Sequence, residues 1–322
     1  QGDIVKVEWG DRKSKALTPS SLRCLSYLPT VNLTTGCVHD CIYCYIRGYS
    51  QYPGQSAVRV YRNTAQLIAR ELDRKRNKPL AVYFSPSSDA FMPVKEVLDE
   101  AYQVMKLLLD RRIGIQFVTK GKVPEMFLEL FAKQPELVAG QVGLCTLDDA
   151  LNDVIEPNAA LASDRLDTLW QLVRIGVTTS LRADPLIHGV TDHDDDLDRL
   201  FARVSACGIR HVSASYLFLR PAIVGSFKRN IADPDLLNRI FEPFEQARRS
   251  AICGSSSSAL SLPAKVRETQ LERVQHIAKQ HGLTLNICGC KNEDLTSSKC
   301  HLTNLTVTAK AAKRPVDQAT LW

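Results

Sequence analysis

Three cysteines lie within eight residues and are the clearest candidates for chemistry in the sequence. In the stretch GCVHDCIYCY at 36–45, three residues separate Cys37 from Cys41 and two separate Cys41 from Cys44. A structural zinc site normally has four protein ligands close together, but the next cysteine along the chain is Cys145. Three thiolates without a fourth suit a 4Fe-4S cube, in which three irons take cysteine and the fourth stays open for an exogenous ligand.

A zinc or purely structural site is the alternative interpretation of the same cysteines. His39 lies inside this loop and is the candidate further ligand in that case. In the cluster interpretation, His39 instead shields the cluster or hydrogen-bonds a sulfur atom. The two interpretations differ in reactivity, because only an iron with a free coordination position can bind another molecule.

A second group of cysteines lies in ICGCKNEDLTSSKCH at 287–301: Cys288, Cys290 and Cys300. Cys253 or His301 could add a further ligand. Our first interpretation is an auxiliary iron-sulfur cluster and our second is zinc, because thiolate-rich sites bind both metals. Cysteines that bind no metal are the third.

The composition is that of a globular protein large enough for one barrel or two smaller domains. The chain has 322 residues, of which 44% are hydrophobic and 24% charged. No apolar run approaches the roughly 18 residues of a membrane span, and the stretch QGDIVKVEWG has neither the basic n-region nor the apolar h-region typical of a signal peptide. From these features we expect a cytoplasmic location and no membrane contact; in a reducing cytosol the ten cysteines, too few for a disulfide scaffold and too clustered for mere core filling, suggest metal binding. The net charge of +6 is mild; we expect it to be spread along the chain, where it permits contact with nucleic acid without arguing for it.

Apolar runs alternate with helical patterns along most of the chain. The predicted strands are 29–34, 80–84, 114–118, 140–146, 177–181, 209–219 and 283–288. The clearest predicted helices are 94–109, 164–175 with Asp164 as its N-cap, and 264–281. This alternation predicts parallel βαβ units, and about six of them favour a partial or complete barrel over a doubly wound sheet. The cysteine loop follows the first strand, at the strand end where barrel enzymes build active sites.

The motif CxxxCxxC after the first strand of a βα barrel resembles the radical S-adenosylmethionine (SAM) superfamily. The resemblance implies a partial (β/α)6 TIM-type barrel in which Cys37, Cys41 and Cys44 bind a 4Fe-4S cluster. It also implies that SAM binds the open iron and is cleaved by one electron to a 5′-deoxyadenosyl radical, which abstracts hydrogen from a substrate. A low-potential electron donor such as ferredoxin or flavodoxin is the implied partner.

Several segments between residues 28 and 220 are similar to the spore photoproduct lyase group of this superfamily. Tyr43 and Tyr45, in CIYCY, match a tyrosine pair that belongs to a radical relay in the lyase. Lys120, in VTKG, matches a lysine that contacts SAM, which makes it the candidate for the SAM carboxylate. Ser87 and Ser88, in FSPSSDAF, take the place of small polar groups near the SAM amino group.

The longest similar piece is the run at 155–192, from IEPNAALASDRL to PLIHGVTD. Arg165 and Arg182 stand where the group usually has arginine, and the resemblance makes Arg182 a further cofactor-binding candidate. The acidic run TDHDDDLDR at 191–199 invites a metal-site interpretation, but we expect the solvated first turn of a helix, where negative charge complements the macrodipole.

One departure from the lyase bears on function. The lyase has a cysteine just before its Ser-Asp that donates hydrogen to the product radical, whereas SPSSD at 85–89 has none. Cys145, at the end of the fourth predicted strand, is the nearest alternative donor, and a small buried hydrophobe is its plainer interpretation. The resemblance therefore implies SAM chemistry without the lyase's own hydrogen donor.

We expect three parts in the chain: an N-terminal extension at 1–28, a barrel at 29–250, and a C-terminal extension at 251–322 that carries the second cysteine group. Three hypotheses follow for its function. The first is a radical SAM enzyme acting on an unidentified substrate, with an auxiliary cluster. The second is a lyase-like enzyme that repairs or modifies nucleic acid, and the third is a non-catalytic iron-sulfur or zinc protein.

Overall fold

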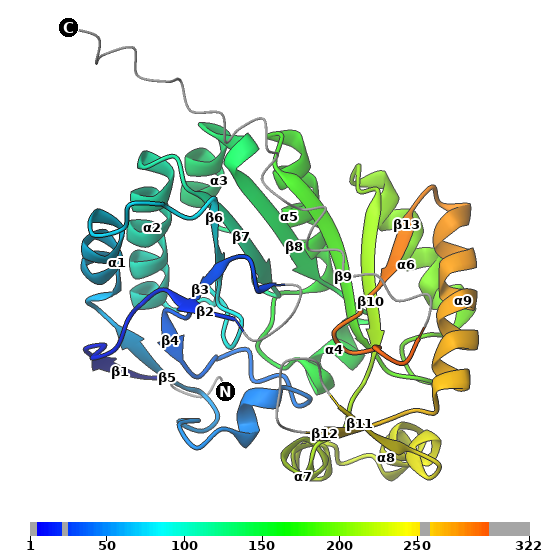
Figure 1. Cartoon of the computed structure of the whole chain (residues 1–322). Coiled ribbons are helices and arrows are strands. Elements are labelled where there is room, and N and C mark those ends of the chain that lie inside the picture. The colour runs from blue at the N-terminus through cyan, green and yellow to red at the C-terminus, as the bar shows by residue number, and fades with distance from the viewer. Residues whose placement is uncertain (1–4, 21–24, 252–257, 296–322) are drawn as a thin grey trace, which may run out of the picture.

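The computed structural model of the chain describes residues 5–20, 25–251 and 258–295 (Figure 1). Its centre is a sheet of eight strands in the order β13-β10-β9-β8-β7-β6-β3-β2. The strands are β2 (Thr18–Pro19), β3 (Pro29–Val31), β6 (Ala81–Phe84), β7 (Gly114–Thr119), β8 (Val138–Gly143), β9 (Thr178–Leu186), β10 (His211–Tyr216) and β13 (Thr284–Ile287).

All neighbouring strands of this sheet are parallel except β2, which runs antiparallel to β3. From β3 to β13 the paired strands follow one another without reversal of direction across the sheet, which is the winding of a βα barrel rather than of a doubly wound sheet. In the described residues the sheet does not close, because β13 and β2 stand at its two ends. The expected partial barrel is therefore confirmed, and it is open.

Helices cover the outer face of the sheet (Figure 1). Apart from α4 (Asp149–Ile155), whose apolar residues belong to a separate cluster with Ile42 at the lower end of the sheet, the covering helices are α1 (Thr64–Asp73), α2 (Lys95–Asp110), α3 (Glu125–Ala132), α5 (Ala162–Arg174), α6 (Asp194–Ala206) and α9 (Ala264–Gln280). The main core lies between these helices and the strands; Phe84, Phe117 and Leu181 are among its fully buried strand residues. The stripe of apolar residues that predicts α2 is buried in this core, as a helix of three- and four-residue apolar spacing requires.

Two smaller units flank the barrel. Helices α7 (Pro221–Asn230) and α8 (Pro234–Phe241) pack with the hairpin of β11 (Arg248–Ala251) and β12 (Ser258–Ser261) below it. A second sheet is formed by β1 (Lys6–Gly10), β5 (Ala57–Tyr61) and β4 (Thr34–Thr35), in the order β1-β5-β4.

Most predicted elements are observed within a few residues of their expected bounds, and two differ. The run at 29–34 is divided between β3 and β4, which belong to different sheets. Asp164 does not cap its helix, because α5 begins at Ala162 and Leu161 is the N-cap, so Asp164 lies in the first turn. Among the helices of the described residues, none is both long and apolar enough to cross a membrane. Cys253, Cys300 and His301 lie outside the described residues.

Candidate active site

The cysteine loop runs from the end of β4 to the short helix η2 (Tyr45–Gly48). Cys41 is buried, whereas Cys37 and Cys44 are half-buried, and none of the three forms a disulfide. Cys37 packs against the valines of the β1-β5-β4 sheet. The three thiols are close enough that the charge on each affects the others.

Two left-handed backbone positions shape this loop. Gly36 has a φ of +87°, and a Cβ atom there would lie 2.6 Å from the carbonyl oxygen of Ala57. Asp40 has a φ of 51°, and its carboxylate accepts a 2.7 Å hydrogen bond from the Ser56 backbone N–H. The buried Arg47 side chain donates to the carbonyls of Asp40 and Cys41, at 2.6 and 3.1 Å. Contacts within the protein thus hold the backbone of the loop in place.

His39 ties the loop to the ends of β6 and β7. Its Nε2 lies 3.1 Å from Asp89 Oδ2 and its Nδ1 lies 3.0 Å from the Asn158 carbonyl oxygen, so both ring nitrogens have partners other than sulfur. Asp89 also accepts hydrogen bonds from the Thr119 hydroxyl and the Lys120 backbone N–H, each at 2.8 Å. Burial opposes the charge on Asp89, but His39 and these donors hold its pKa below the usual range. The expected bond from the His39 side chain to a sulfur is not observed, because both ring nitrogens have other partners; only the His39 backbone N–H lies near the Cys37 thiol, where it partly offsets the rise in the pKa of that thiol.

A buried group of charges lies beside Cys41. Arg165 Nη1 donates to Glu156 Oε2 at 2.5 Å and to the Gly143 carbonyl at 3.0 Å, and both charged side chains are almost fully buried. The Tyr43 hydroxyl donates to the other Glu156 oxygen. Burial opposes the charge on Glu156, but Arg165 and Lys120 keep the pKa of its carboxyl below the usual range.

Lys120 carries its charge in this buried environment. Burial would lower the pKa of Lys120, but the nearby Glu156 carboxylate raises it overall. Its Nζ lies 5.4 Å from the centre of the Tyr43 ring. Gly143 leaves room for the side chain, because a Cβ at that position would lie 3.0 Å from Lys120 Cγ. A permanent cation is therefore held next to the cysteine loop, where it could bind a carboxylate.

The serines after β6 offer unused hydrogen-bonding groups. The buried hydroxyls of Ser85 and Ser88 have no hydrogen-bond partner in the described structure. Ser87 is held by its backbone N–H, which donates to Asn32 Oδ1 at 2.9 Å, and its hydroxyl lies near the phenols of Tyr45 and Tyr49. Because buried hydroxyls without partners are uncommon, Ser88 and Ser85 are the better candidates for contact with a bound ligand.

The two tyrosines beside Cys44 face different surroundings. Tyr43 is turned toward Glu156 and Lys120, and burial raises the pKa of its phenol. Tyr45 is 38% exposed; it donates to the Pro86 carbonyl and packs edge to face against Tyr49, with ring centres 5.7 Å apart. Of this pair, Tyr43 therefore lies nearer the buried charges.

Cys145 is buried next to the same group of charges. It is 3% exposed, and its thiol lies close enough to Lys120, Glu156 and Asp184 for their charges to affect it. Burial and the two carboxylates raise the pKa of Cys145, so it is a neutral thiol carrying a hydrogen atom. This placement is compatible with both interpretations of Cys145, a hydrogen donor and a small buried residue.

Polar side chains line the inner face of the barrel. Gln141 on β8 donates to Ser180 on β9 at 3.2 Å and to Ser213 on β10 at 3.4 Å. Arg182 points to the same face and pairs with Asp184 at 2.6 Å. Because a barrel's inner face is normally filled by apolar side chains, this polar lining is a candidate substrate wall.

The segment after β13 folds over that inner face. Lys291 Nζ lies 2.5 Å from Asp184, which therefore has two cationic partners. Burial opposes the charge on Asp184, but Lys291 and Arg182 together lower its pKa to about 2. Cys290 is buried against Tyr83 and Leu25, and Cys288 belongs to the same cluster. The structure thus brings Cys288 and Cys290 to the inside of the barrel, while their expected partner Cys300 lies outside the described residues.

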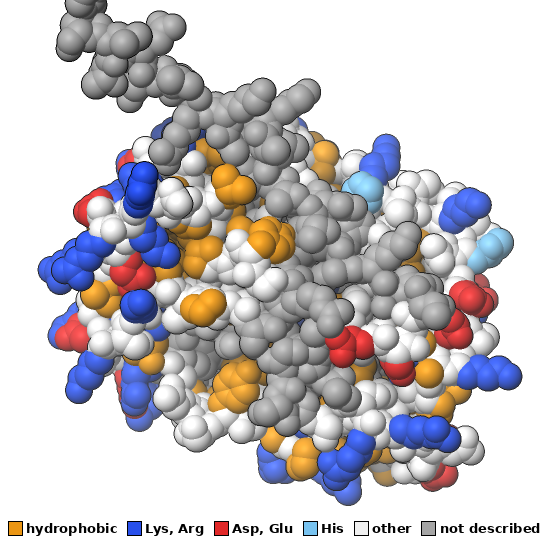
Figure 2. All heavy atoms as spheres, in the orientation of Figure 1, with side chains coloured by type: hydrophobic (Ala, Val, Ile, Leu, Met, Phe, Trp, Pro, Cys, Tyr) orange, Lys and Arg blue, Asp and Glu red, His pale blue; other side chains and the backbone are white. Residues whose placement is uncertain are grey.

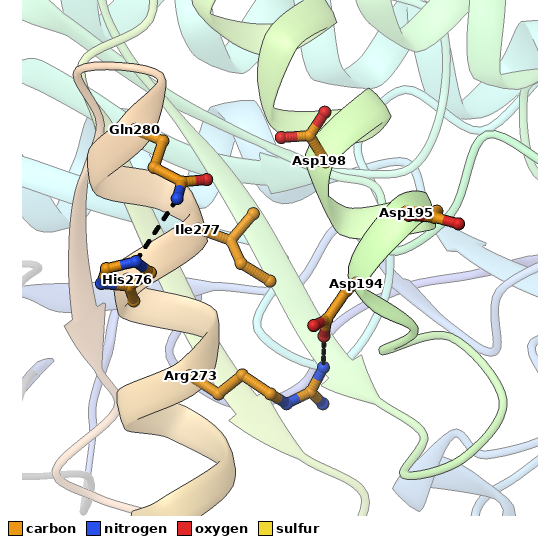
Figure 3. A pocket seen from close by; sticks show the side chains of 7 residues that line it. All are labelled: Asp194, Asp195, Asp198, Arg273, His276, Ile277 and Gln280. Atoms are coloured by element: carbon orange, nitrogen blue, oxygen red, sulfur yellow. Dashed lines mark hydrogen bonds and ion pairs between the residues drawn. The ribbon is translucent and has the colours of Figure 1, made fainter.

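The acidic run at 191–199 lies away from this site. As predicted, it supplies the first turn of α6, with Asp194, Asp195 and Asp196 at the helix start. Figure 3 shows the hollow of about 420 Å³ between α6 and α9, which Asp194, Asp195 and Asp198 of this run border and where Arg273 of α9 pairs with Asp194. The acidic run therefore has a cationic partner, Arg273, within the protein itself.

The donor set of the cysteine loop fits an iron-sulfur cluster. Burial raises the pKa of all three thiols, to about 12 for Cys41, so the ligands are neutral before metal binds and would be deprotonated by the positive charge of bound irons. Within the described ranges, no group of three or more His, Cys, Asp or Glu side chains is placed so that it could hold a single metal ion. The unpaired serine hydroxyls and Lys120 next to the loop fit a ligand with both an amino and a carboxylate group.

Several residues of the site were not predicted from the sequence. Glu156 and Asp89 organise the buried charges, and Lys291 reaches Asp184 from the other end of the chain. Glu156 and Asp89 lie inside the quoted segments at 155–192 and 84–91, so an unexplained acidic residue within each segment was the available signal. Arg165 is fully buried, unlike the surface charge that an isolated arginine at a helix start would normally be.

The chain matches one family model and several known proteins in sequence. The family model described as Radical SAM superfamily matches residues 31–201, which include the cysteine loop, Lys120 and Glu156. The "Radical SAM Nalpha-GlyT isomerase" of Pseudomonas phage M6 is 28% identical over 182 residues, 56% of this chain. This match spans only 37% of that relative's length. A Mycobacterium tuberculosis (strain H37Rv) protein described as uncharacterised is 26% identical over 270 residues, 80% of this chain and 76% of the relative.

Solved structures show the same fold. A spore photoproduct lyase mutant superposes with a TM-score of 0.67 at 14% identity, covering 88% of this chain and 82% of the lyase. A radical SAM methyltransferase from Sphaerobacter thermophilus superposes with a TM-score of 0.51 at 16% identity, covering 81% of this chain and 66% of that one. At these identities the likeness concerns the fold.

Proposed function

The chain belongs to the radical SAM superfamily and is a radical SAM enzyme, and from this we propose that Cys37, Cys41 and Cys44 hold a 4Fe-4S cluster that acts on SAM. The observation that carries the proposal is the loop itself: three unpaired thiols, one of them buried, lie next to a buried cation and unpaired serine hydroxyls. When bound, the reduced cluster would supply one electron that cleaves SAM to methionine and a 5′-deoxyadenosyl radical, which abstracts hydrogen from the substrate.

The surrounding residues bind and orient in this proposal. Lys120 would pair with the SAM carboxylate, because it is the cation held beside Cys41. Ser88 and Ser85 would accept hydrogen bonds from the SAM amino group, which satisfies their buried hydroxyls. Glu156 keeps both Lys120 and Arg165 charged and fixes the Tyr43 hydroxyl, so it acts as a positioning residue.

The substrate would lie on the inner face of the barrel. Gln141 and Arg182 supply polar groups there, and Cys145 is the proposed hydrogen donor to the product radical. Cys288, Cys290 and Cys300 are the proposed ligands of an auxiliary iron-sulfur cluster, with zinc as the second choice. A reducing cytoplasm suits both thiolate sites.

Anaerobic reconstitution with iron and sulfide, followed by dithionite and SAM, tests the proposal. We expect 5′-deoxyadenosine and methionine to form, and the Cys41→Ser variant to form neither. About four irons per chain are expected for one cubane cluster and about eight if the second cysteine group binds another. A wild-type protein that contains only zinc, or that leaves SAM intact, would contradict the proposal.

A related enzyme acting on nucleic acid is the second candidate function. The fold likeness to a spore photoproduct lyase complexed with dinucleoside spore photoproduct favours it. The segment 84–91 holds no cysteine near Asp89, so thymine-lesion reversal would require Cys145 as the donor. Assay of lesion-containing dinucleotide with wild type and with Cys145→Ser separates this function from action on another substrate.

A further inference from the structure

The positive charge of the chain is concentrated near its N-terminus. Residues 1–78 contain 13 Lys and Arg against 6 Asp and Glu, a balance of +7, so the other 244 residues carry a balance of −1. The expectation that the charge is spread along the chain is therefore wrong. Figure 2 shows Lys and Arg side chains along the edge of the molecule where Figure 1 places α1, α2 and β1.

The β1-β5-β4 sheet carries part of this charge around a hollow of about 660 Å³. The lining residues include Trp9, Arg12, Lys13, Arg59 and Tyr61. Trp9 is 52% exposed and lies in the same lining as Arg12, Lys13 and Arg59, so an apolar ring and cations are available to a partner at one place. We call this set of five residues the basic hollow.

Two acidic residues, Glu8 and Asp11, also line the hollow, so its three cations, Arg12, Lys13 and Arg59, exceed its carboxylates by one. Glu8 pairs with Arg59 at 3.0 Å and Asp11 pairs with Arg62 at 3.0 Å, and all four side chains are at least one-third exposed. Exposed ion pairs of this kind contribute little stability, so an incoming acidic group can replace them.

The basic hollow lies on the outer side of the cysteine loop. The Arg12 guanidinium lies 4.4 Å from the centre of the Tyr61 ring, and the Tyr61 hydroxyl lies 2.8 Å from Thr35 Oγ1, two residues before Cys37. Cys37 packs on the valines of the same sheet, whereas Cys41 faces Lys120 and Glu156. The loop is thus placed between the basic hollow and the inner wall of the barrel.

We propose that the basic hollow docks an acidic protein that carries a single electron, of the flavodoxin or ferredoxin class. This inference rests on the proposed function, because only a cluster on the cysteine loop needs such a partner. In the step concerned, the reduced cofactor of the carrier loses one electron and the cluster gains it, and no bond is made or broken. SAM and substrate would occupy the inner side of the loop, so the outer side is the free approach to the cluster.

Charge complementarity selects this partner. A carrier with an acidic surface is attracted to Lys13 and Arg59, and Trp9 supplies an apolar contact in the same lining. A nucleic acid would also be attracted by the cations and could stack on Trp9. The position of the basic hollow on the outer side of the loop, away from the substrate wall, favours the electron carrier.

Calorimetric titration of the reconstituted full chain with a bacterial flavodoxin tests the proposal without turnover. The variant Lys13→Glu/Arg59→Glu should bind flavodoxin about tenfold or more weakly than wild type, because two attractive contacts become repulsive. The control Lys265→Glu/Lys279→Glu changes the net charge equally with exposed residues of α9 and should bind like wild type. Wild-type affinity should fall when the salt concentration is raised. Trp9→Ala should weaken binding without changing this salt dependence.

Equal affinity of the two double variants for flavodoxin, or no binding by wild type, would overturn the proposal. So would retention of a thymidine oligonucleotide that depends on Lys13 and Arg59 while flavodoxin does not bind. The outcome is separable from that of the proposed function: cleavage of SAM with dithionite reports on the cluster alone. If dithionite supports cleavage but flavodoxin neither binds nor supports it, only the docking surface is wrong.

Discussion

The change Glu156→Gln tests how the buried charges support the site. Glu156 and Arg165 are both almost fully buried and 2.5 Å apart, so the substitution leaves the Arg165 charge without its carboxylate. Breaking a buried pair by removing one partner costs about 3–5 kcal/mol. This is a large share of the roughly 5–15 kcal/mol by which a domain is stable. We expect the free energy of unfolding of the cluster-free protein to fall by that amount.

Urea unfolding followed by circular dichroism at neutral pH measures the effect. The exposed pair of Glu8 and Arg59 has a similar distance, 3.0 Å, and Glu8→Gln should cost far less because water screens it. The double change Glu156→Leu/Arg165→Met should recover stability relative to Glu156→Gln, since it removes both charges. It should still not cleave SAM, because Lys120 and Tyr43 lose their shared partner. A Glu156→Gln protein within about 1 kcal/mol of wild type would refute this reasoning.

Three further changes probe the loop, the inner wall and the Asp89 hub. Gly36→Ala places a Cβ 2.6 Å from a carbonyl oxygen at a left-handed φ, so it should lower the free energy of unfolding by about 1–3 kcal/mol and reduce the iron content after reconstitution. The control Gly282→Ala also has a left-handed φ but open space around the Cβ, and it should retain the full iron content. The folded-state pKa of Asp184, about 2, lies below its ordinary 3.8, so ionised Asp184 contributes about 2 kcal/mol to the free energy of unfolding above a pH of about 4, and this contribution is lost as the pH falls toward 2. The Asp184→Asn variant should lack this acid dependence of stability. A urea midpoint that depends on pH in the same way in both proteins would contradict the Asp184–Lys291 pairing. Asp89→Ala removes the hydrogen-bond acceptor shared by His39, Thr119 and Lys120, so the free energy of unfolding in urea should fall by about 3 kcal/mol. The iron content per chain after reconstitution should also fall. Full iron content would show that the loop does not need Asp89 to hold His39.

The cysteine chemistry and the barrel could be predicted because both depend on local patterns. The spacing of Cys37, Cys41 and Cys44 lies within eight residues, and the strand–helix alternation is written in apolar periods of a few turns. The loop was predicted directly after the first barrel strand; in the structure it follows β4, which comes two residues after β3 and belongs to the smaller sheet.

The buried charges could not be predicted, because they pair across long distances in the sequence. Lys291 meets Asp184 from 107 residues away, and Asp89 meets His39 from 50. The β1-β5-β4 sheet was missed for the same reason, since β1 pairs with a strand 51 residues later and is only five residues long. Asp164 failed as a cap because the helix began two residues earlier, a shift that propensity does not resolve.

The electron paramagnetic resonance spectrum of the dithionite-reduced, reconstituted protein tests the central claim most directly. If three cysteines hold a 4Fe-4S cluster with one open iron, the wild type gives a reduced-cluster signal that changes when SAM is added, and the Cys37→Ala/Cys41→Ala/Cys44→Ala variant gives no SAM-dependent signal. A wild-type signal that is identical with and without SAM would contradict the account.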